Sequence, residues 1–464
     1  MTERALHRWL PALLPAALFL VAASALILGG FERGRGAADQ INYHEPVIRT
    51  FADQWPAFDF SDYLSATTPA YHVALATFAR FFADSRPALQ FAGALFTIGL
   101  LLTLTLAGMA GMAGSKRDAI GRAVLMTLPV TASLYVFSSG VWLLPDNAAW
   151  WGVLLIVLLA LRADFGTTQL LWSGLILTLL VATRQIHLWA AAVVWAAAWI
   201  GPTRGDDALS SWTDLLRDLP LRLRRTLVAV AVTLPAFGVV YAFVRLWGGL
   251  SPPMLRDDVQ GLNPAAPAFI MAQVGLFSLF FAGWLIGPAR ELVTKRRSTL
   301  LLAVGAGLVI ALVPATSYSI DAGRFSGLWN AARATPLVFG RVSPLIVVLA
   351  VGGVVASVTW FLALPLRTRW IGLAALVAFI AAQTASHNCW QRYHEPFILI
   401  LMAVLARDLD PDYAPSTPHR VGPRAGRFAR VAGPLALALL LALVTIITLA
   451  SANPVRPLPG AGGV

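Results

Sequence analysis

The segment from Asp39 to His72 carries the most conspicuous side-chain chemistry of this sequence. It is polar, acidic and aromatic, whereas the chain around it is mostly apolar. Asp39 is its first acidic residue and is followed at once by Gln40, Tyr43 and His44. A carboxylate here could act as a general base, taking the proton of an acceptor hydroxyl while that hydroxyl attacks an anomeric carbon. The alternative interpretation is that Asp39 is a solvated loop carboxylate.

Polar groups also occur at six later places, the first inside the same segment and the other five within or next to apolar runs. They are Thr67-Thr68-Pro69, Asp146-Asn147, Arg184-Gln185-His187, Asp257-Asp258, Asp321 with Arg324, and His387 with Arg392, His394 and Glu395. Polar groups near membrane depth are costly unless they are paired or face a cavity. Such groups are therefore candidates for a binding site.

Each of these patches also has a plain structural explanation. Thr68 and Pro69 are suited to begin a helix, and Arg184 could extend its charge to the membrane surface. Asp321 and Arg324 could form a surface ion pair, which contributes about 0 to 1 kcal/mol. Arginine is equally suited to bidentate phosphate contact. A metal site is not expected, because the separation of His387 and His394 matches no standard ligand spacing.

The composition identifies the elements that must position these residues. The 464-residue chain is 58% hydrophobic and 12% charged, with a mean hydropathy of +0.71, which is typical of an all-α polytopic membrane protein. The net charge of +12 does not indicate nucleic-acid binding, because the basic residues form short clusters between apolar runs. Only Lys116 and Lys295 are lysines, and alanine is abundant, a weak indication of a GC-rich bacterial genome. Cys389 is the single cysteine and cannot form an internal disulfide.

About 13 spans are predicted, after an N-terminal run from Leu10 to Gly30 that we interpret as a first span and not as a cleaved signal. The others are expected near 88–113, 119–140, 147–163, 167–183, 186–201, 226–247, 266–287, 298–316, 337–365, 370–386, 394–406 and 431–450. Residues 68–82 are expected to form a helix at the membrane surface. Residues 31–87 then form a long outer loop with interfacial helices, and 407–430 a basic cytoplasmic loop before the last span.

The distribution of Lys and Arg predicts which side each loop faces. Alternating from a cytoplasmic N-terminus with Arg4 and Arg8, most of the 35 basic residues fall on the inner side. The polar patches and the Asp39 segment then share the outer side, which predicts one outward-facing site in a single domain, 1–464. No P-loop, dinucleotide fingerprint, HExxH or paired CxxC motif occurs.

Five of these stretches resemble a known family. They are DQINYHEP (39–46), TTPAYH (67–72), RQIHLW (184–189), DAGRFSGLW (321–329) and QRYHEPFIL (391–399). In this order they are similar to the acidic first-loop, TT-P, RQTN, late aromatic and closing RYFILP blocks of the dolichyl-phosphate-glucose α-1,2-glucosyltransferases. Gln40 departs from the second acidic residue of the first block, and His187 from the Asn of the RQTN block.

The resemblance implies a multi-span GT-C type glycosyltransferase that inverts at the anomeric carbon without a metal or other cofactor. Asp39 matches the acidic residue that serves as base or lies beside the acceptor, with Asp321 and Glu395 as competing candidates. Arg184, Arg324 and Arg392 match arginines expected near the donor phosphate. Substrate contacts are expected from the remaining polar residues of these stretches and from Asp146: Gln40, Tyr43, His44, Thr68, Tyr71, Asp146, Gln185, His187, Asp321, His394 and Glu395.

We therefore expect a glycosyltransferase of the bacterial inner membrane with its site facing the periplasm. It would move a hexose, in the first place glucose, from a polyprenyl phosphate to a lipid-linked or cell-envelope glycan. The rival interpretation is a transporter or flippase of a lipid-linked glycan. Broken helices do not recur at corresponding positions of two halves, which weakens that rival.

Overall fold

The computed structural model of the protein describes residues 10–110, 116–202, 218–255, 261–409 and 425–456. These residues form helices, joined by loops that contain three isolated β-bridges. Arg4, Arg8, Asp257, Asp258 and most of the predicted basic loop 407–430 lie outside the described residues. The helices are η1 (Leu10–Leu13), α2 (Leu14–Leu28), α3 (Gly34–Asp39), η2 (Gln40–His44), α4 (Glu45–Gln54), α5 (Ala70–Phe81), α6 (Arg86–Met109), α7 (Lys116–Ala132), α8 (Leu134–Val141), α9 (Asp146–Leu161), α10 (Thr167–Thr183), η3 (Gln185–Ala190), α11 (Ala191–Ile200), α12 (Leu219–Trp247), η5 (Pro253–Leu255), α14 (Ala266–Ser278), η6 (Leu279–Phe281), α15 (Ala282–Lys295), α16 (Arg297–Leu312), α17 (Leu328–Arg333), α18 (Pro344–Ala363), α19 (Leu366–Thr384), α20 (Gln391–Asp408) and α21 (Ala425–Ala450).

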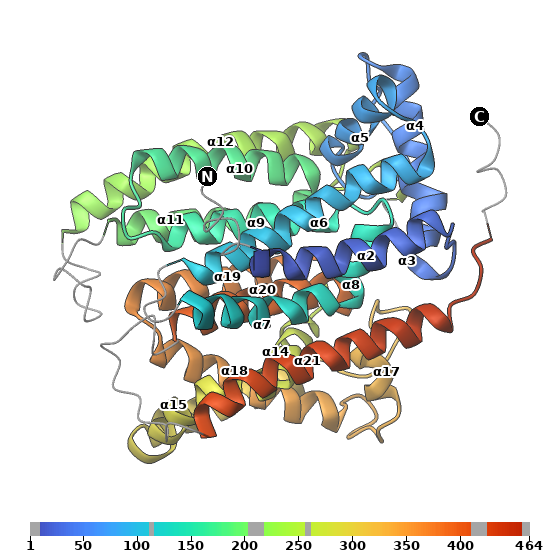
Figure 1. The fold of residues 1–464 in the computed structure, drawn as a ribbon. Coiled ribbons are helices and arrows are strands. Elements are labelled where there is room, and N and C mark those ends of the chain that lie inside the picture. Colours follow the sequence, from blue (N-terminus) through green and yellow to red (C-terminus); the bar gives the residue numbers. More distant parts are fainter. Residues whose placement is uncertain (1–9, 111–115, 203–217, 256–260, 410–424, 457–464) are drawn as a thin grey trace.

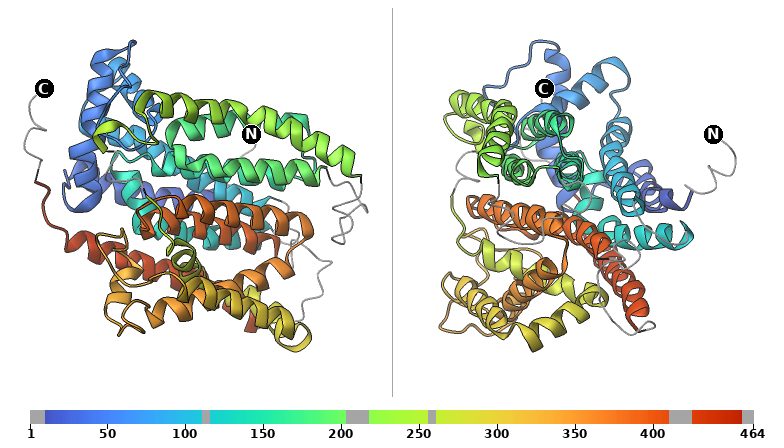
Figure 2. Two further views of the ribbon diagram at one scale, coloured as in Figure 1. Left: turned by 180° about the vertical axis from the view of Figure 1, so that it is seen from behind. Right: turned by 90° about the vertical axis from the view of Figure 1, so that its left-hand side faces the viewer.

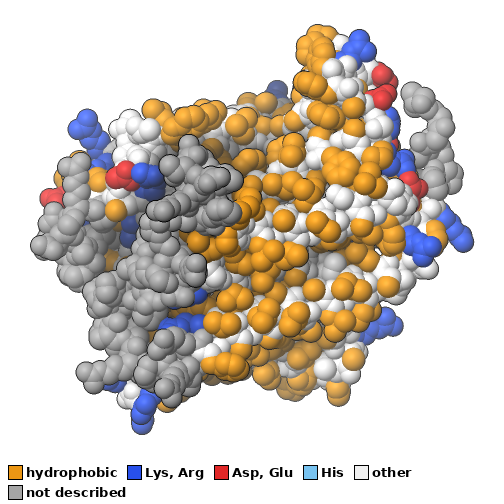
Figure 3. All heavy atoms as spheres, viewed as in Figure 1, with side chains coloured by type: hydrophobic (Ala, Val, Ile, Leu, Met, Phe, Trp, Pro, Cys, Tyr) orange, Lys and Arg blue, Asp and Glu red, His pale blue; other side chains and the backbone are white. Residues whose placement is uncertain are grey.

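The long helices run roughly side by side, and α3, α4 and α5 stand at one end of the bundle (Figure 1). The view from behind shows the same arrangement, and α17 also lies toward that end (Figure 2). Figure 3 shows hydrophobic side chains across the middle of one face, with charged side chains toward its margins. This distribution fits a bilayer around the middle of the bundle.

The prediction of 13 spans is not supported. Within the described ranges, seven helices are long and apolar enough to cross a membrane, or eight if the bent pair α7 and α8 counts as one span. Predicted spans near 147–163, 167–183, 186–201 and 298–316 correspond to apolar helices of 10–17 residues. At 1.5 Å per residue such helices fall short of the ~30 Å hydrocarbon core.

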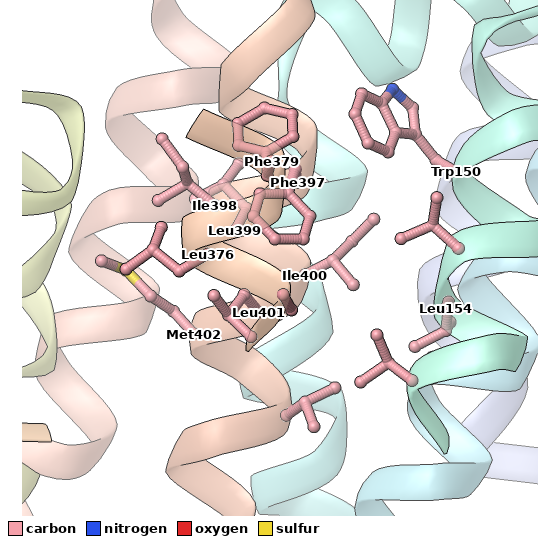
Figure 4. Packing of buried hydrophobic residues seen from close by; sticks show 14 of the residues in the cluster. Trp150, Leu154, Leu376, Phe379, Phe397, Ile398, Leu399, Ile400, Leu401 and Met402 are labelled. Atoms are coloured by element: carbon pink, nitrogen blue, oxygen red, sulfur yellow. The ribbon is translucent and has the colours of Figure 1, made fainter. Parts of the chain in front are cut away.

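Helix α20 lies at the centre of the bundle. All its residues from His394 to Asp408 are buried. Figure 4 shows Phe397 of this helix near Phe379 of α19, with Trp150 of α9 facing them. The Phe379 and Phe397 ring centroids are 4.2 Å apart. This packing holds the amino-terminal turn of α20, with Arg392 and Tyr393, at the bundle end that carries α3.

The break between α7 and α8 has a local cause. Pro129 lies in the last turns of α7, and the two helices meet at a 72° bend at Ser133. The Ser133 hydroxyl caps α8 by accepting from the Val136 amide and donates to the Glu395 carboxylate of α20 at 2.6 Å. Glu395 therefore helps to fix the bend.

Candidate active site

A cavity of about 840 Å³ is lined in part by α3, which stands at one end of the bundle (Figure 1). Its lining comes from α3, η2, α9, η3, α11, α12, α19, α20 and the loops around them. Nine of the predicted site residues contribute to the lining or to the loops that form it. Eight line the cavity directly: Asp39, Tyr43, His44, Asp146, Arg184, Gln185, His187 and Arg392. The ninth, Thr68, supports one of those loops, as described below.

Asp39 and Arg392 form an ion pair in the cavity wall. Asp39 is the last residue of α3, and Arg392 is the second residue of α20. The Arg392 Nη1 donates to the Asp39 Oδ2 at 2.6 Å, across a sequence separation of 353 residues. Their side chains are 17% and 21% exposed, so both remain open to a ligand in the cavity.

Gln40 positions this pair without facing the cavity. It is 1% exposed, and its amide oxygen accepts from Gln90 of α6 at 3.0 Å and from the Leu143 backbone at 3.3 Å. Its amide nitrogen donates to Glu45, which also accepts from Arg49 and Arg86. Gln40 therefore makes structural contacts, because these bonds tie η2 to α6, to α4 and to the segment before α9, and its predicted substrate contact stays a prediction.

A second acid–arginine pair lines the same cavity. Arg184, directly after α10, is ion-paired with Asp146, the first residue of α9. The guanidinium of Arg184 also lies 5.4 Å from the ring centroid of Tyr393, and that of Arg392 lies 5.1 Å from the same centroid. Tyr393 thus brings two cations together, and cation–π contact offsets part of their repulsion.

Arg35 is a third arginine in the lining, and the sequence analysis missed it. It lies one helical turn before Asp39 on α3, and its guanidinium is 4.3 Å from the Trp390 ring centroid. No hydrogen-bond acceptor or carboxylate partner is recorded for it among the described residues. The lining therefore holds three arginines against two carboxylates. The available signal was its four-residue spacing from Asp39.

His44 and His72 form a hydrogen-bonded pair beside Asp39. His44 Nδ1 and His72 Nε2 are 2.9 Å apart, and the rings stack with centroids 5.2 Å apart. His44 lines the cavity, and His72 is fully buried on α5. Burial, with the charges of Arg392 and Arg184, lowers the pKa of His44 to about 3. Burial and His44 lower the pKa of His72 well below its usual value. Both rings are therefore neutral at pH 7.

Gln185 joins two of the predicted stretches. Its amide oxygen accepts from the Thr68 amide at 3.0 Å, and its amide nitrogen donates to the Ala66 and Leu250 carbonyls at 2.8 and 2.7 Å. The Thr68 hydroxyl donates to the Val181 carbonyl at 2.6 Å. Thr68 is buried and supports the loop, and the cavity is lined instead by its neighbours Ser65, Ala66 and Thr67.

Arg324 and Asp321 lie outside the lining of the cavity, so the structure does not bring them together with Asp39 and Arg392. The Arg324 Nε donates to the Ser317 carbonyl at 2.8 Å, and Asp321 is exposed in the turn that precedes it. Paired backbone bonds between Ser319 and Arg324 close this turn. The turn geometry therefore directs the guanidinium to its own loop.

Tyr71, His394 and Glu395 also lie outside the lining. They are buried among other helices: His394 lies 3.3 Å from the Gln273 amide, and Glu395 accepts from Ser133 and from Gln391. Tyr71 packs in a separate cluster with α4 and α6. Their predicted substrate contacts would require these internal contacts to open. Among the described residues, no group of three or more His, Cys, Asp or Glu could hold a metal ion.

No family model and no curated protein matches the chain by sequence. Among solved structures, it is similar to ArnT from Cupriavidus metallidurans over 94% of this chain and 77% of that one, with 12% identity and a TM-score of 0.34. It is also similar to the arabinosyltransferase EmbB from Mycobacterium smegmatis over 92% of this chain and 40% of that one, with 12% identity and a TM-score of 0.35. Both TM-scores lie below 0.5, so neither similarity assigns an activity to this chain, and the GT-C type architecture stays a prediction.

Proposed function

We propose that this protein is a membrane glycosyltransferase. It transfers a hexose, in the first place glucose, from a polyprenyl phosphate to a hydroxyl of a lipid-linked or cell-envelope glycan. The observation that carries the proposal is the Asp39–Arg392 ion pair in the wall of a large cavity with one more cation than carboxylate. Such a wall attracts one phosphate monoanion and places a carboxylate beside it.

The phosphate would bind the arginines that remain able to donate. Arg35 has an uncommitted guanidinium, and Arg392 uses one nitrogen for Asp39. Arg184, paired with Asp146, adds a third positive charge. These residues take the place of Arg324 in the predicted phosphate clamp. When the phosphate draws Arg392 toward itself, Asp39 becomes freer to accept a proton.

The reaction is a single displacement at the anomeric carbon. The acceptor oxygen forms a bond to that carbon as the bond to the phosphate oxygen breaks, and the electron pair of the broken bond stays on the polyprenyl phosphate. Asp39 receives the hydroxyl proton during this step, since the free hydroxyl is far too weak an acid to lose it beforehand. Attack opposite the leaving phosphate inverts the configuration. The arginines stabilise the charge on the leaving group.

The rest of the lining suits a lipid-linked donor. Beyond the arginines, the lining contains Trp195 of α11, Phe237 and Val240 of α12, and Ala378 of α19. This apolar part can accept the start of a hydrocarbon chain. Arg162 and Arg367 lie at the opposite end of α9 and α19 from the cavity. Because basic residues favour the cytoplasmic side, this supports a cavity that faces the periplasm of a bacterial inner membrane.

The proposed function is tested by measuring the transfer of glucose from the donor to an acceptor. Membranes with the protein, the Asp39→Asn variant or no protein are incubated with radiolabelled polyprenyl-phosphate glucose, and products are identified by mass spectrometry. We expect one acceptor to gain a single hexose only with the unaltered protein. Movement of an unchanged labelled lipid to the opposite leaflet, without transfer, would instead support a flippase.

A further inference from the structure

One wall of the cavity combines aromatic rings with polar groups that have no partner. Trp150 of α9, His187 and Trp189 of η3, and Gln383 of α19 form this wall, which we call the neutral wall. The Trp150 and His187 ring centroids are 4.6 Å apart, and those of His187 and Trp189 are 6.3 Å apart. Figure 4 shows Trp150 opposite Phe379, which lies one helical turn before Gln383 on α19.

Five polar atoms of the neutral wall make no hydrogen bond within the described residues. They are the Nε1 atoms of Trp150 and Trp189, both ring nitrogens of His187 and the Oε1 of Gln383. All five atoms are covered by their neighbours, although their side chains line the cavity, so a ligand reaches them only when these side chains rotate. A buried polar group without a hydrogen bond destabilises the protein, and a ligand that supplies the bond removes this cost. By contrast, Trp195 lines the same cavity, and its Nε1 donates to the Thr233 hydroxyl at 3.0 Å.

The chemistry of the five unpaired atoms indicates which kind of ligand could form hydrogen bonds with them. A hydrocarbon chain against this wall would leave every one unpaired. A sugar ring offers C–H faces to the indole rings and hydroxyls to the His187 nitrogens and the Gln383 oxygen, after small rotations of the imidazole and the amide. Arg184 lies three residues before His187, so a phosphate held at the arginines would bring its attached sugar to the neutral wall.

We propose that the neutral wall is the subsite for the donor sugar, and that it selects an uncharged sugar over an amino sugar. This inference rests on the proposed function. The wall contains no carboxylate, and the two carboxylates of the lining, Asp39 and Asp146, are each paired with an arginine. An ammonium group on the sugar would meet no free anion and would be repelled by the three arginines.

The experiment measures how much the sugar adds to binding. Purified protein is titrated with the methyl ester of polyprenyl phosphate, called here the bare phosphate, with the glucose ester and with the glucosamine ester. All three have equal chain length and the same single negative charge on the phosphate. We expect the glucose ester to bind at least about tenfold more tightly than the bare phosphate, which corresponds to one or two new hydrogen bonds. We expect the glucosamine ester to bind several-fold more weakly than the glucose ester. Equal binding of the two esters would overturn the selection for an uncharged sugar.

Variants separate the subsite from the phosphate site. His187→Phe and Trp150→Phe should reduce the tenfold difference between glucose ester and bare phosphate toward equality, while the affinity for bare phosphate stays unchanged. Trp195→Phe is the matched control, because it removes an indole N–H that already has a partner and lies in the apolar part of the cavity, which meets the hydrocarbon chain of both ligands. It should change both affinities alike and therefore keep the difference between them. His187→Gln retains a hydrogen-bond donor and acceptor, so it should keep most of the affinity difference between the glucose ester and the bare phosphate.

Each remaining outcome has a distinct meaning. A tenfold difference that persists in both His187→Phe and Trp150→Phe would overturn the subsite while the proposed function stands. Failure of the unaltered protein to bind any polyprenyl phosphate would overturn the proposed function itself. Unchanged affinity for the bare phosphate shows that a variant is folded, so loss of the sugar contribution cannot then be attributed to unfolding.

Discussion

Two regions of this protein each contain an aspartate and an arginine, and only the first of these regions supplies charge to the cavity. At the end of α3, Asp39 meets Arg392 of α20 in the cavity wall. In the turn before α17, Asp321 is exposed, and Arg324 donates to a carbonyl of its own loop. The first pair joins distant parts of the chain, whereas the second region closes on itself.

The second region supports the first through its backbone. The Gly323 carbonyl accepts from the Cys389 amide at 3.0 Å, and the Trp329 indole donates to the Cys389 carbonyl at 2.7 Å. Gly323 has a φ of +63°, and a Cβ there would lie 2.5 Å from the His387 carbonyl oxygen. This close packing fixes the loop that brings Trp390 and Arg392 to the cavity. An acid–arginine patch can therefore serve a site either by its charges or by its backbone.

The largest expected effect comes from removing the carboxylate of the first region. Asp39→Asn keeps the shape and one hydrogen bond to Arg392 but cannot accept the acceptor proton. Loss of a general base typically lowers the rate by 10²- to 10⁴-fold. Single-turnover transfer at saturating donor should fall by that order, while donor binding is retained.

Two further variants test whether the effect is specific to the carboxylate of Asp39. Asp321→Asn, in the second region, should leave single-turnover transfer near normal, because Asp321 is exposed and outside the cavity. Asp146→Asn also breaks an acid–arginine pair of the lining and should affect donor binding more than the chemical step. Normal transfer by Asp39→Asn, with loss in Asp321→Asn or in Glu395→Gln, would show that the base is misassigned.

A smaller effect is expected from the arginines. Arg35→Ala and Arg392→Ala should each weaken donor binding by about 1.5 to 3 kcal/mol, the range for hydrogen bonds to a charged group. Arg35→Lys and Arg392→Lys should restore little of the lost donor affinity, because the lysine ammonium lacks the planar guanidinium that donates two parallel hydrogen bonds to a phosphate. Arg324→Ala should change donor affinity little, since its guanidinium is directed to the Ser317 carbonyl. Titration with bare polyprenyl phosphate measures the affinity of all three alanine variants. A larger loss of affinity in Arg324→Ala than in the other two would show that Arg324 binds the phosphate.

The sequence predicted the all-α membrane class because long apolar runs follow from composition alone. It also predicted that polar patches far apart in the chain meet, and the structure joins Asp39 to Arg392, Thr68 to Gln185 and Asp146 to Arg184. It could not tell which patch residues face the cavity. Glu395 and Arg392 are three residues apart on α20, yet one fixes a helix bend and the other lines the cavity. That difference depends on packing against α7 and α8.

The number of spans was overpredicted for a related reason. Hydropathy identifies an apolar run, but it does not tell whether the helix is long enough to cross the bilayer. The apolar run near 186–201 begins as η3 and continues as α11, whose last residue is Ile200. Polar groups such as His187 occur inside it because it lines the cavity. Arg35 was missed because its role depends on the stacking of its side chain on Trp390.

The smallest expected effect concerns the histidine pair beside Asp39. In the folded protein, burial and the facing Arg392 and Arg184 lower the pKa of His44 from 6.5 to about 3. Below pH 6.5 the unfolded chain therefore binds a proton at His44 that the folded chain does not. The folded state loses stability as pH falls from 6.5 toward 3, because the proton favours the unfolded chain. Between pH 7 and pH 5, His44 should lower the free energy of unfolding by about 2 kcal/mol.

His72 adds to this loss in the same direction, since its pKa is lowered as well. The matched control is the double variant His44→Phe, His72→Phe, which keeps two stacked rings but cannot titrate. In detergent, the thermal midpoint of the unaltered protein should fall more between pH 7 and pH 5 than that of the double variant. Asp39 is a further titratable group of this wall, so both proteins should be compared in the Asp39→Asn background too. If the two midpoints fall equally in both backgrounds, the pair is not neutral in the folded protein, and the cavity wall carries more positive charge than the contacts of Arg35, Arg184 and Arg392 imply.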